Sequence, residues 1–477
     1  MTRNPSRGSI LVQTIVFSSV AALVIASLVG WAVASTRFAR ESTYREQAFH
    51  IAEAGLEYYR WHLAHAPSDF QDGTGQPGPY LHTYTDKNGV VVGAYSLDIT
   101  APSGGSALAV IRSTGTVTGY PGISRTVEAA LAIPSLASYA IIGNADLRFG
   151  EGTEVFGVVH SNGGIRFDGV AHNIVASSRA TYDEPDHTGG VEHAVHTHFG
   201  SVDPLPPAAL PSRPDVFMAG RSVSVPTVDF AGITADMAAM KAQAQSGGRY
   251  LPASGGLGYH VVLQATGMMN IYRVNTLAAL PSGCTDPGNQ SGWGSWSVNT
   301  QTLIGSYAVP ANGILFLEDH AWVDGVLNGR LTIAAGRFPD TAINRRSIVV
   351  NNDLTYAAYD GTDALSLIAQ QDINVGLVSD NDLRIDAALI AQNGRVGRFY
   401  YSAPSGGSQR CSPYHARASI TLFGSMMTAN RYGFAYVDGT GYQTRTLNFD
   451  ASFIYAPPPF FPLSSEQYSV VSWREVK

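Results

Sequence analysis

The chain has 477 residues with 50 glycines, 25 prolines and only 14% charged residues, so we expect two or three folded units built of short strands and many turns. The formal net charge of −7, without a basic run, excludes the electrostatic pattern of a nucleic-acid-binding protein over the whole chain. Two cysteines exclude both a disulfide-dense scaffold and a cysteine-rich zinc module.

The N-terminal segment 9–36 contains no Asp, Glu, Lys or Arg. It is longer than the roughly 20 residues with which a helix crosses a bilayer, whereas a cleavable secretory signal has an apolar region of about 7–15 residues. The segment therefore predicts a single transmembrane helix. Apolar residues at three- and four-residue spacing from Ala48 to Leu63 predict that this helix continues as an amphipathic one, over 9–66 in total.

Two motifs at this end of the chain resemble those of type IV pilin-like proteins. The basic stretch Met1–Gly8, followed by Ser9 and the apolar run, is similar to a prepilin leader, and Gln47–Glu57 is similar to the helix of minor pilins of the PilX type. The resemblance implies cleavage after Gly8 by a prepilin peptidase, usually with methylation of the new terminal residue Ser9. It further implies a chain anchored in the cytoplasmic membrane, with its large part outside the cytoplasm, that assembles with other pilin-like subunits.

The sequence departs from the pilin pattern at Gln13, where the family typically has Glu. A carboxylate inside a membrane is costly unless it finds a cationic partner, and in pilins it is thought to pair with the terminal amine of a neighbouring subunit. Gln13 offers only neutral hydrogen bonds. Pilin-like subunits at a filament tip are similar in lacking this Glu, so the resemblance implies a place at the tip rather than along the shaft.

A Gly/Pro-rich break at 72–79 precedes three segments with strand-like alternation, 93–100, 107–117 and 125–132. We expect them to form a small antiparallel sheet within residues 80–133. A long N-terminal helix against such a sheet is the arrangement that the pilin resemblance implies.

The remainder of the chain shows repeated apolar triplets. Those at Ile314, Leu331, Ile348, Leu365 and Leu383 begin 17 or 18 residues apart, and those at Leu147 and Ile165 are 18 apart. Turn-forming Asn, Asp and Gly lie between them, so each unit is predicted to be one coil of a β-solenoid whose coils stack over a shared core. Leu367 and Leu389 indicate a second spacing of 22, and a β-sandwich is the alternative fold.

We therefore predict a mainly β protein with one long N-terminal α-helix. The first coils are expected in 138–200 and the main solenoid in 301–477, with the Pro/aromatic segment 455–462 as its cap. The intervening part, 201–300, is predicted to be an insertion with a Pro-rich stretch at 203–214, a short helix at 229–245 and a strand pair at 259–274.

A tract of histidines and acids is the strongest candidate for site chemistry. Imidazoles and carboxylates at such spacing can bind a transition metal, but a solvated polar loop is the simpler interpretation, and we predict no metal and no cofactor. Cys284 and Cys411 could form one disulfide or remain two thiols. The tract comprises Asp186, His187, Glu192, His193, His196 and His198.

The function expected is that of a minor pilin or pseudopilin-like subunit. Such a subunit would take part in filament assembly, priming or tip display, and in adhesion to a surface polymer or glycan. The alternative is a membrane-tethered β-helix enzyme acting on polysaccharide, for which several acids would have to share one face. The acids considered are Asp372, Asp380, Asp382 and Asp386, which we interpret as turn residues, and we expect no enzymatic activity.

Overall fold

The computed structural model describes residues 8–102, 108–464 and 467–476. The predicted leader residues 1–7 lie outside the described part. The chain divides into two compact units, one made of residues 8–102, 108–132 and 467–476 and the other of residues 133–464. The chain is mainly β with one long N-terminal helix, as the sequence predicts.

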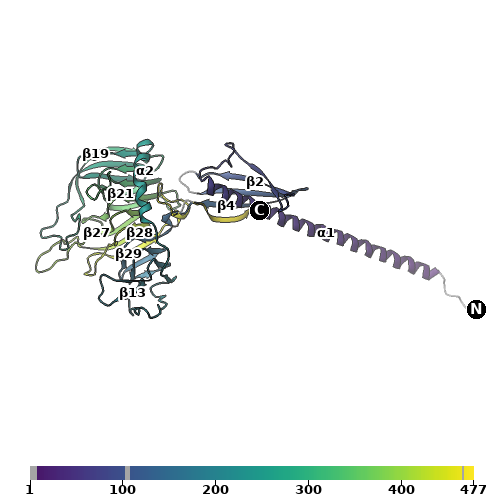
Figure 1. Cartoon of the computed structure of the whole chain (residues 1–477), viewed down its shortest axis with the longest axis horizontal. Helices are drawn as coiled ribbons and strands as arrows, with labels where there is room; N and C mark the ends of the chain where they lie inside the picture. The colour runs from purple at the N-terminus through teal and green to yellow at the C-terminus, as the bar shows by residue number, and fades with distance from the viewer. Residues whose placement is uncertain (1–7, 103–107, 465–466, 477) are drawn as a thin grey trace, which may run out of the picture. The chain divides into compact units, whose positions relative to one another are not determined.

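Helix α1, Gly8–His65, is continuous over 58 residues, or about 87 Å at 1.5 Å per residue (Figure 1). Residues 10–43 are exposed along the whole circumference. From Ala48 onward one face is buried, at the spacing that the sequence predicts for an amphipathic helix. The buried positions are Ala48, Ile51, Ala52, Leu56, Tyr59 and Leu63.

The buried face of α1 packs against a five-stranded antiparallel sheet with the strand order β1-β2-β3-β4-β30. The three strands expected from the sequence are present as β2, β3 and β4. The strands are β1 (Tyr80–Thr85), β2 (Val91–Thr100), β3 (Ala109–Val117), β4 (Tyr120–Ala132) and β30 (Ser469–Val476).

Small residues bring the helix and the sheet into close contact. A Cβ atom on Gly115 of β3 would lie 2.1 Å from the carbonyl oxygen of Ala48, and a Cβ on Gly55 of α1 would lie 2.3 Å from Ser113 Oγ. The backbones therefore touch where larger residues would hold them apart. Ala48, Ala52 and Gly55 in the segment Gln47–Glu57 thus serve packing.

Strand β30 differs from the expectation, which places its residues in the main solenoid, 301–477. It pairs antiparallel with β4, Arg474 lying opposite Glu128. Arg112 of β3 and Arg474 both donate to the Glu128 carboxylate, at 2.9 Å and 2.5 Å, and the pKa of Glu128 lies below its ordinary value, chiefly because of the Arg112 hydrogen bond. The second unit is therefore inserted between two neighbouring strands of the first.

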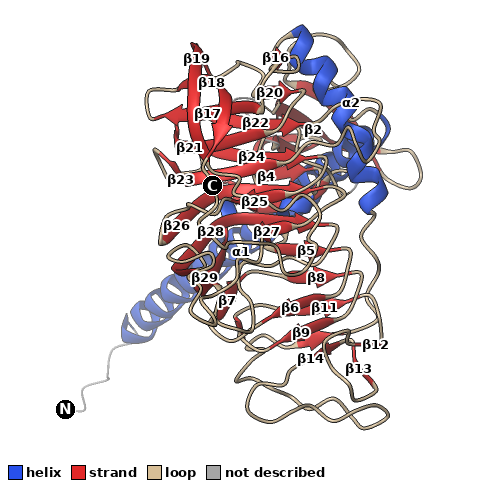
Figure 2. Cartoon of the chain, turned by 90° about the vertical axis from the view of Figure 1, so that its left-hand side faces the viewer, coloured by secondary structure: helices blue, strands red, loops and turns tan. Residues whose placement is uncertain are grey.

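The second unit is built on parallel ladders of short strands (Figure 2). The longest runs through β16 (Arg249–Leu251), β20 (Ile314–Leu317), β22 (Arg330–Ala335), β24 (Ala364–Ala369), β26 (Asp382–Ala391), β28 (Ala416–Thr428), β5 (Ile141–Gly143), β8 (Val159–Ser161), β11 (Val175–Ser177) and β15 (Arg221–Ser222).

Further strands extend this arrangement. One ladder joins β17 (Gly258–Gln264), β21 (Ala321–Leu327), β23 (Ile348–Tyr356), β25 (Ile373–Val375) and β27 (Val396–Arg398). Strand β18 (Met268–Leu277) pairs antiparallel with β17, and β19 (Val298–Ala308) pairs antiparallel with β18. Another continues from β26 and β28 through β29 (Gly441–Phe449), β7 (Thr153–Phe156) and β10 (Val170–Ala171). Strands β6 (Leu147–Phe149), β9 (Ile165–Phe167) and β14 (Val195–His196) form a short ladder, beside the hairpin β12 (Thr181–Asp183) and β13 (Val191–His193).

The order of strands in the longest ladder differs from their order in the chain. The chain enters at β5, in the middle, and proceeds to β15 at one end; it then resumes at β16 at the other end and returns to β28, which pairs with β5. The segment 223–248, which includes helix α2 (Phe230–Ser246), connects the two ends. The predicted helix at 229–245 is thus present, as is the predicted strand pair, as β17 and β18.

The longest ladder is buried on both faces. Alternate residues of β20 and β22, such as Leu315 and Ile333, contribute to one apolar core, while Ile314, Phe316 and Ala334 contribute to a second core with Met237 and Met240 of α2. Continuous apolar triplets result, because strands covered on both sides need no alternation.

The Pro/aromatic segment also covers this second face. Arg330 of β22 donates to the carbonyl oxygens of Ala456 and Pro457, at 2.6 Å and 2.7 Å, and Phe461 is buried in the second core. The segment therefore packs along the side of the ladder, and the predicted cap over its end is wrong.

The 17-residue spacing does not describe the pairing. Ile314 pairs with Thr332, but Leu331 pairs with Leu365, and Ile348 belongs to a different ladder. Leu367 does pair with Leu389, 22 residues later, and Leu147 pairs with Ile165, 18 residues later. Unequal loops between strands explain why no single period holds.

Gly115→Ala is expected to destabilise the first unit by at least about 1–3 kcal/mol, because its Cβ would overlap the Ala48 carbonyl oxygen. Hydrogen–deuterium exchange of β2–β4 in the full chain measures the effect. The matched control is Gly122→Ala in β4, where the added Cβ meets no atom within 4 Å. Equal exchange in the two variants would contradict the close-packing explanation.

Candidate functional site

The N-terminal half of α1 carries the residues that the sequence assigns to processing and assembly. Gly8 and Ser9 lie in its first turn, and Gln13 lies one turn further on, exposed within the apolar run. The hydroxyl groups of this half donate to carbonyl oxygens three or four residues earlier, as Thr14 does to Ile10 at 2.8 Å and Ser27 to Val24 at 2.8 Å. These internal bonds reduce the cost of placing hydroxyl groups in lipid.

This half of the helix fits a single-pass membrane anchor. Large apolar side chains point outward around its circumference, among them Phe17, Leu23 and Trp31, each more than 70% exposed. By length and composition, α1 is the one helix in the described part of the chain that could cross a membrane. Its apolar run, about 42 Å long, exceeds the roughly 30 Å hydrocarbon core of a bilayer.

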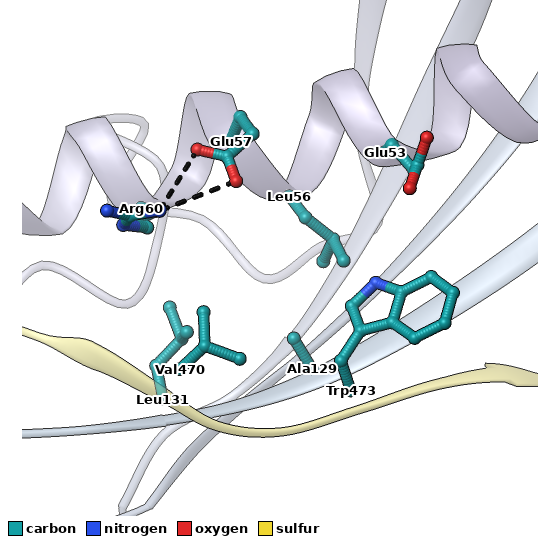
Figure 3. Close-up of a pocket in the computed structure, with 8 residues that line it drawn as sticks. All are labelled: Glu53, Leu56, Glu57, Arg60, Ala129, Leu131, Val470 and Trp473. Carbon is teal, nitrogen blue, oxygen red and sulfur yellow. Dashed lines mark hydrogen bonds and ion pairs between the residues drawn. The ribbon is translucent and has the colours of Figure 1, made fainter.

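The C-terminal half of α1 and the neighbouring strands β4 and β30 enclose a pocket of about 260 Å³ (Figure 3). Leu56, Leu131 and Val470 give it an apolar lining, while Arg60 donates to Glu57 at the helix, at 3.3 Å. Trp473 of β30, 47% exposed, lies at one side and makes an edge contact with Phe49. The lining can accommodate an apolar side chain beside an ion pair.

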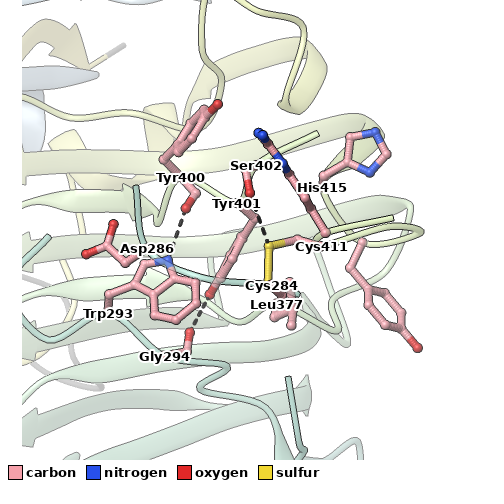
Figure 4. Close-up of a disulfide and its surroundings, with 12 residues drawn as sticks. Cys284, Asp286, Trp293, Gly294, Leu377, Tyr400, Tyr401, Ser402, Cys411 and His415 are labelled. Atoms are coloured by element: carbon pink, nitrogen blue, oxygen red, sulfur yellow. Dashed lines mark hydrogen bonds between the residues drawn. A yellow bond between two sulfur atoms is a disulfide. The ribbon is translucent and has the colours of Figure 1, made fainter. Parts of the chain in front are cut away.

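The two cysteines form a disulfide in the second unit, with a Cα–Cα distance of 4.5 Å across 127 residues of sequence (Figure 4). Both are buried with Leu377, Phe399 and Tyr401. The loops that carry them are further joined by hydrogen bonds from Trp293 Nε1 to Tyr400 O and from Tyr401 Oη to Gly294 O, at 3.0 Å and 2.8 Å. The pair connects the loop after β18 to the loop before β28, and no reactive thiol is left there.

The histidine-rich tract is not a solvated loop throughout. Glu192 and His196 are 3% and 1% exposed, so that interpretation is wrong for these two residues. They meet His198 and Glu184, and the four residues are here called the Glu/His cluster. Of the other tract residues, His187 contacts Glu192 at 2.6 Å. Asp186 instead pairs with Arg148 and Arg431, and His193 contacts the Ala208 carbonyl oxygen.

Sequence reasoning missed Glu184 in this cluster. It lies just after β12 and two residues before the first residue of the tract, between Asp183 and Pro185. Only the antiparallel pairing of β12 with β13, in which Tyr182 lies opposite Glu192, brings Glu184 to the histidines.

The acids considered for polysaccharide chemistry occupy different kinds of position. Asp386 lies within β26, where it is fully buried and accepts hydrogen bonds from Tyr359 Oη and Arg384 Nε, at 2.5 Å and 2.8 Å. Asp382 begins the same strand, so the interpretation as turn residues is wrong for this pair. Asp372 accepts a bond from Arg395 N at 2.8 Å, and burial raises its pKa above the ordinary value.

Replacing both cysteines with serine is expected to lower the free energy of unfolding of the second unit by about 4 to 5 kcal/mol in the chain-entropy model, because the disulfide closes a loop of more than 100 residues. Chemical denaturation of the full chain measures this. Treatment of the unchanged chain with a reductant should give a similar loss, while the double variant should not respond to the reductant. A double variant as stable as the oxidised chain would contradict the stabilising role.

No protein-family model matches the chain, and no curated protein matches it. Among solved structures, the chain is similar to the crystal structure of the competence-associated pilin ComZ from Thermus thermophilus. The sequence identity is 16%, the match covers 91% of this chain and 98% of that chain, and the TM-score is 0.29. A match at that score carries no inference about the fold or function of this chain.

Proposed function

We propose that this protein is a membrane-anchored minor subunit of a type IV pilus-type filament, with the large β-rich unit as its displayed part. The observation that carries the proposal is the division of α1 into two halves. One half exposes a continuous apolar surface with internally bonded hydroxyl groups, and the other is held by a small antiparallel sheet.

The same helix can serve in the membrane and in a filament. Its apolar surface suits lipid before assembly and suits the helices of other pilin-like subunits afterwards, since side chains that pack against lipid can pack against one another. The leader resemblance supports processing after Gly8 by a prepilin peptidase, and the Gln47–Glu57 motif supports a PilX-type minor pilin.

The residue Gln13 supports a position at the filament tip. A subunit inside the shaft has neighbours on both sides, and the family's carboxylate pairs with a neighbour's amine at this level of the helix. An amide lacks the charge for that pair, so a chain with Gln13 gains less from shaft neighbours than one with Glu. A tip position requires fewer such contacts.

The second unit suits display and adhesion. Its insertion between adjacent strands β4 and β30 tethers it by two chain segments, and its disulfide is suited to an oxidising compartment outside the cytoplasm. We propose that it contacts a surface polymer or glycan. Release of reducing ends from a glycan panel by the full chain would instead support the tethered polysaccharide enzyme.

The mature N-terminus tests the proposal directly. Mass analysis of the membrane-extracted chain is expected to show a protein that begins at Ser9 with a methylated amine, and Gly8→Val is expected to retain residues 1–8. An unchanged chain that begins at Met1 would contradict prepilin processing, and the helix would then be a plain membrane anchor.

The Gln13→Glu variant tests the tip position. We expect more of this variant than of the unchanged chain in sheared filaments, because the restored carboxylate can pair with a neighbour's amine along the shaft. Gln47→Glu, the same substitution outside the apolar run of α1, is the control and should leave filament content unchanged. Abundant shaft incorporation of the unchanged chain would contradict the tip position.

A further inference from the structure

A buried group of carboxylates and imidazoles lies at one end of the second unit. The hairpin β12–β13 supplies Glu184, just after β12, and Glu192, on β13. His196 lies on β14, and His198 follows this strand. Strand β14 is the last in the ladder β6-β9-β14, and the hairpin lies beside it at the lower end of the unit in Figure 2. One potential ligand atom from each of the four residues lies within 4.8 Å of all the others.

The ring of His196 presents an unused lone pair to this group. Its Nδ1 lies 3.1 Å from the carbonyl oxygen of His193, which can only accept, so Nδ1 carries the proton. The other nitrogen, Nε2, is therefore unprotonated in the neutral ring, and it has no hydrogen-bond partner although the side chain is only 1% exposed. The Glu184 carboxylate lies 3.6 Å from Nε2, too far for a hydrogen bond.

An orphaned nitrogen of this kind is costly in a protein interior unless something occupies it. The Nδ1 bond to a backbone carbonyl is the support that metal-binding histidines commonly receive, because it sets the tautomer and aims Nε2 at the ion. Glu192 has comparable support: its oxygens accept bonds from His187 Nδ1 at 2.6 Å and from Glu184 N at 3.2 Å.

The charges around the group favour a cation. The Arg166 guanidinium lies 2.7 Å from Asp168 and 3.3 Å from Glu184, whereas Glu192 accepts a bond from the His187 imidazole. With neutral imidazoles, the carboxylates exceed the guanidinium by two charges.

We propose that the Glu/His cluster is a binding site for a divalent first-row transition metal of the zinc class. Two imidazole nitrogens and two carboxylate oxygens match the borderline character of Zn²⁺ and its preference for four ligands, whereas Ca²⁺ and Mg²⁺ prefer oxygen ligands alone. Four protein ligands close the coordination shell, which is the pattern of a structural site.

The ion would fasten the hairpin β12–β13 to the last strand of its ladder. Strand β14 has only two residues and pairs with β9 on one side, so β14 is itself the end strand of the ladder. Terminal strands need covering because their backbone groups are otherwise open to other chains. A metal bound from both sides would link the hairpin that covers this end to the ladder.

Zinc binding by the full chain tests the proposal. The chain is purified in detergent without a polyhistidine tag, stripped with a chelator and titrated with Zn²⁺, and Co²⁺ is used as a visible-absorption probe of the coordination. We expect one equivalent of Zn²⁺ per chain, a raised melting temperature and an intense tetrahedral Co²⁺ spectrum.

Three variants identify the ligands. His196→Ala, Glu192→Gln and His198→Ala are each expected to weaken Zn²⁺ binding by at least about 100-fold. The matched control is His193→Ala, which removes an imidazole of the same tract that contacts the Ala208 carbonyl oxygen and keeps the backbone acceptor for His196. Glu192→Gln preserves shape and His198 is only partly buried, so these variants remain informative if His196→Ala does not fold.

The outcomes separate the proposal from a purely ionic cluster. Stoichiometric binding that the three ligand variants lose and His193→Ala retains supports the metal site. Absence of stoichiometric binding in the unchanged chain, or loss of it equally in His193→Ala, overturns the proposal and assigns the cluster to the ion pairs of Arg166 and His187. Neither outcome depends on filament assembly, so the test is separate from that of the proposed function.

Discussion

The pairing of β5 with β28 is the constraint on which the second unit depends. Ile141, Ile142 and Gly143 lie beside Met426, Met427 and Thr428 in parallel register, although almost the whole unit separates them in the sequence. This pairing places the beginning and the end of the unit side by side in the middle of its longest ladder. The two connecting segments then run together, with Leu136 N donating to Pro462 O at 3.1 Å and Ser464 N to Pro134 O at 2.8 Å.

That geometry explains how so large a unit can be an insertion. The first unit offers two neighbouring strand ends, at Ala132 of β4 and Ser469 of β30, which pair with each other. An inserted unit is tolerated when its own ends are close together, because the host sheet then need not open. If the strands were stacked in the order of the sequence, the two ends of the second unit would be separated by the full length of the ladder. The segment 223–248, with α2, prevents this separation because it carries the chain from one end of the ladder to the other, from which the chain comes back to β5.

The two units use different physical means to exclude water. In the first, small residues on α1 and Gly115 on β3 let the backbones touch, so one helix covers the sheet closely. In the second, α2 and the Pro/aromatic segment cover a ladder face that would otherwise be exposed. In the same unit the disulfide joins two long loops, and the Glu/His cluster brings residues of the hairpin β12–β13 next to residues at and after β14.

Local patterns in the sequence determined the elements of this protein. The charge-free run, the spacing of Ala48 to Leu63 and the alternation in β2 to β4 identify α1 and most of the small sheet, because periodicity reports which side of an element is buried. The apolar triplets identify many of the strands of the second unit for a different reason, because strands that are buried on both faces are apolar without interruption. Neither pattern carries information on which distant strand each one meets.

Only the tertiary structure decided the partners. The assignment of β30 to the small sheet, the β5–β28 pairing and the contact of Glu184 with His196 all join residues whose local sequence is compatible with other positions. The triplets failed as a guide to register because loops of unequal length separate the strands, so equal spacing in sequence is not equal position in a ladder. Burial on both faces, which depends on segments far away in the chain, selected the actual arrangement.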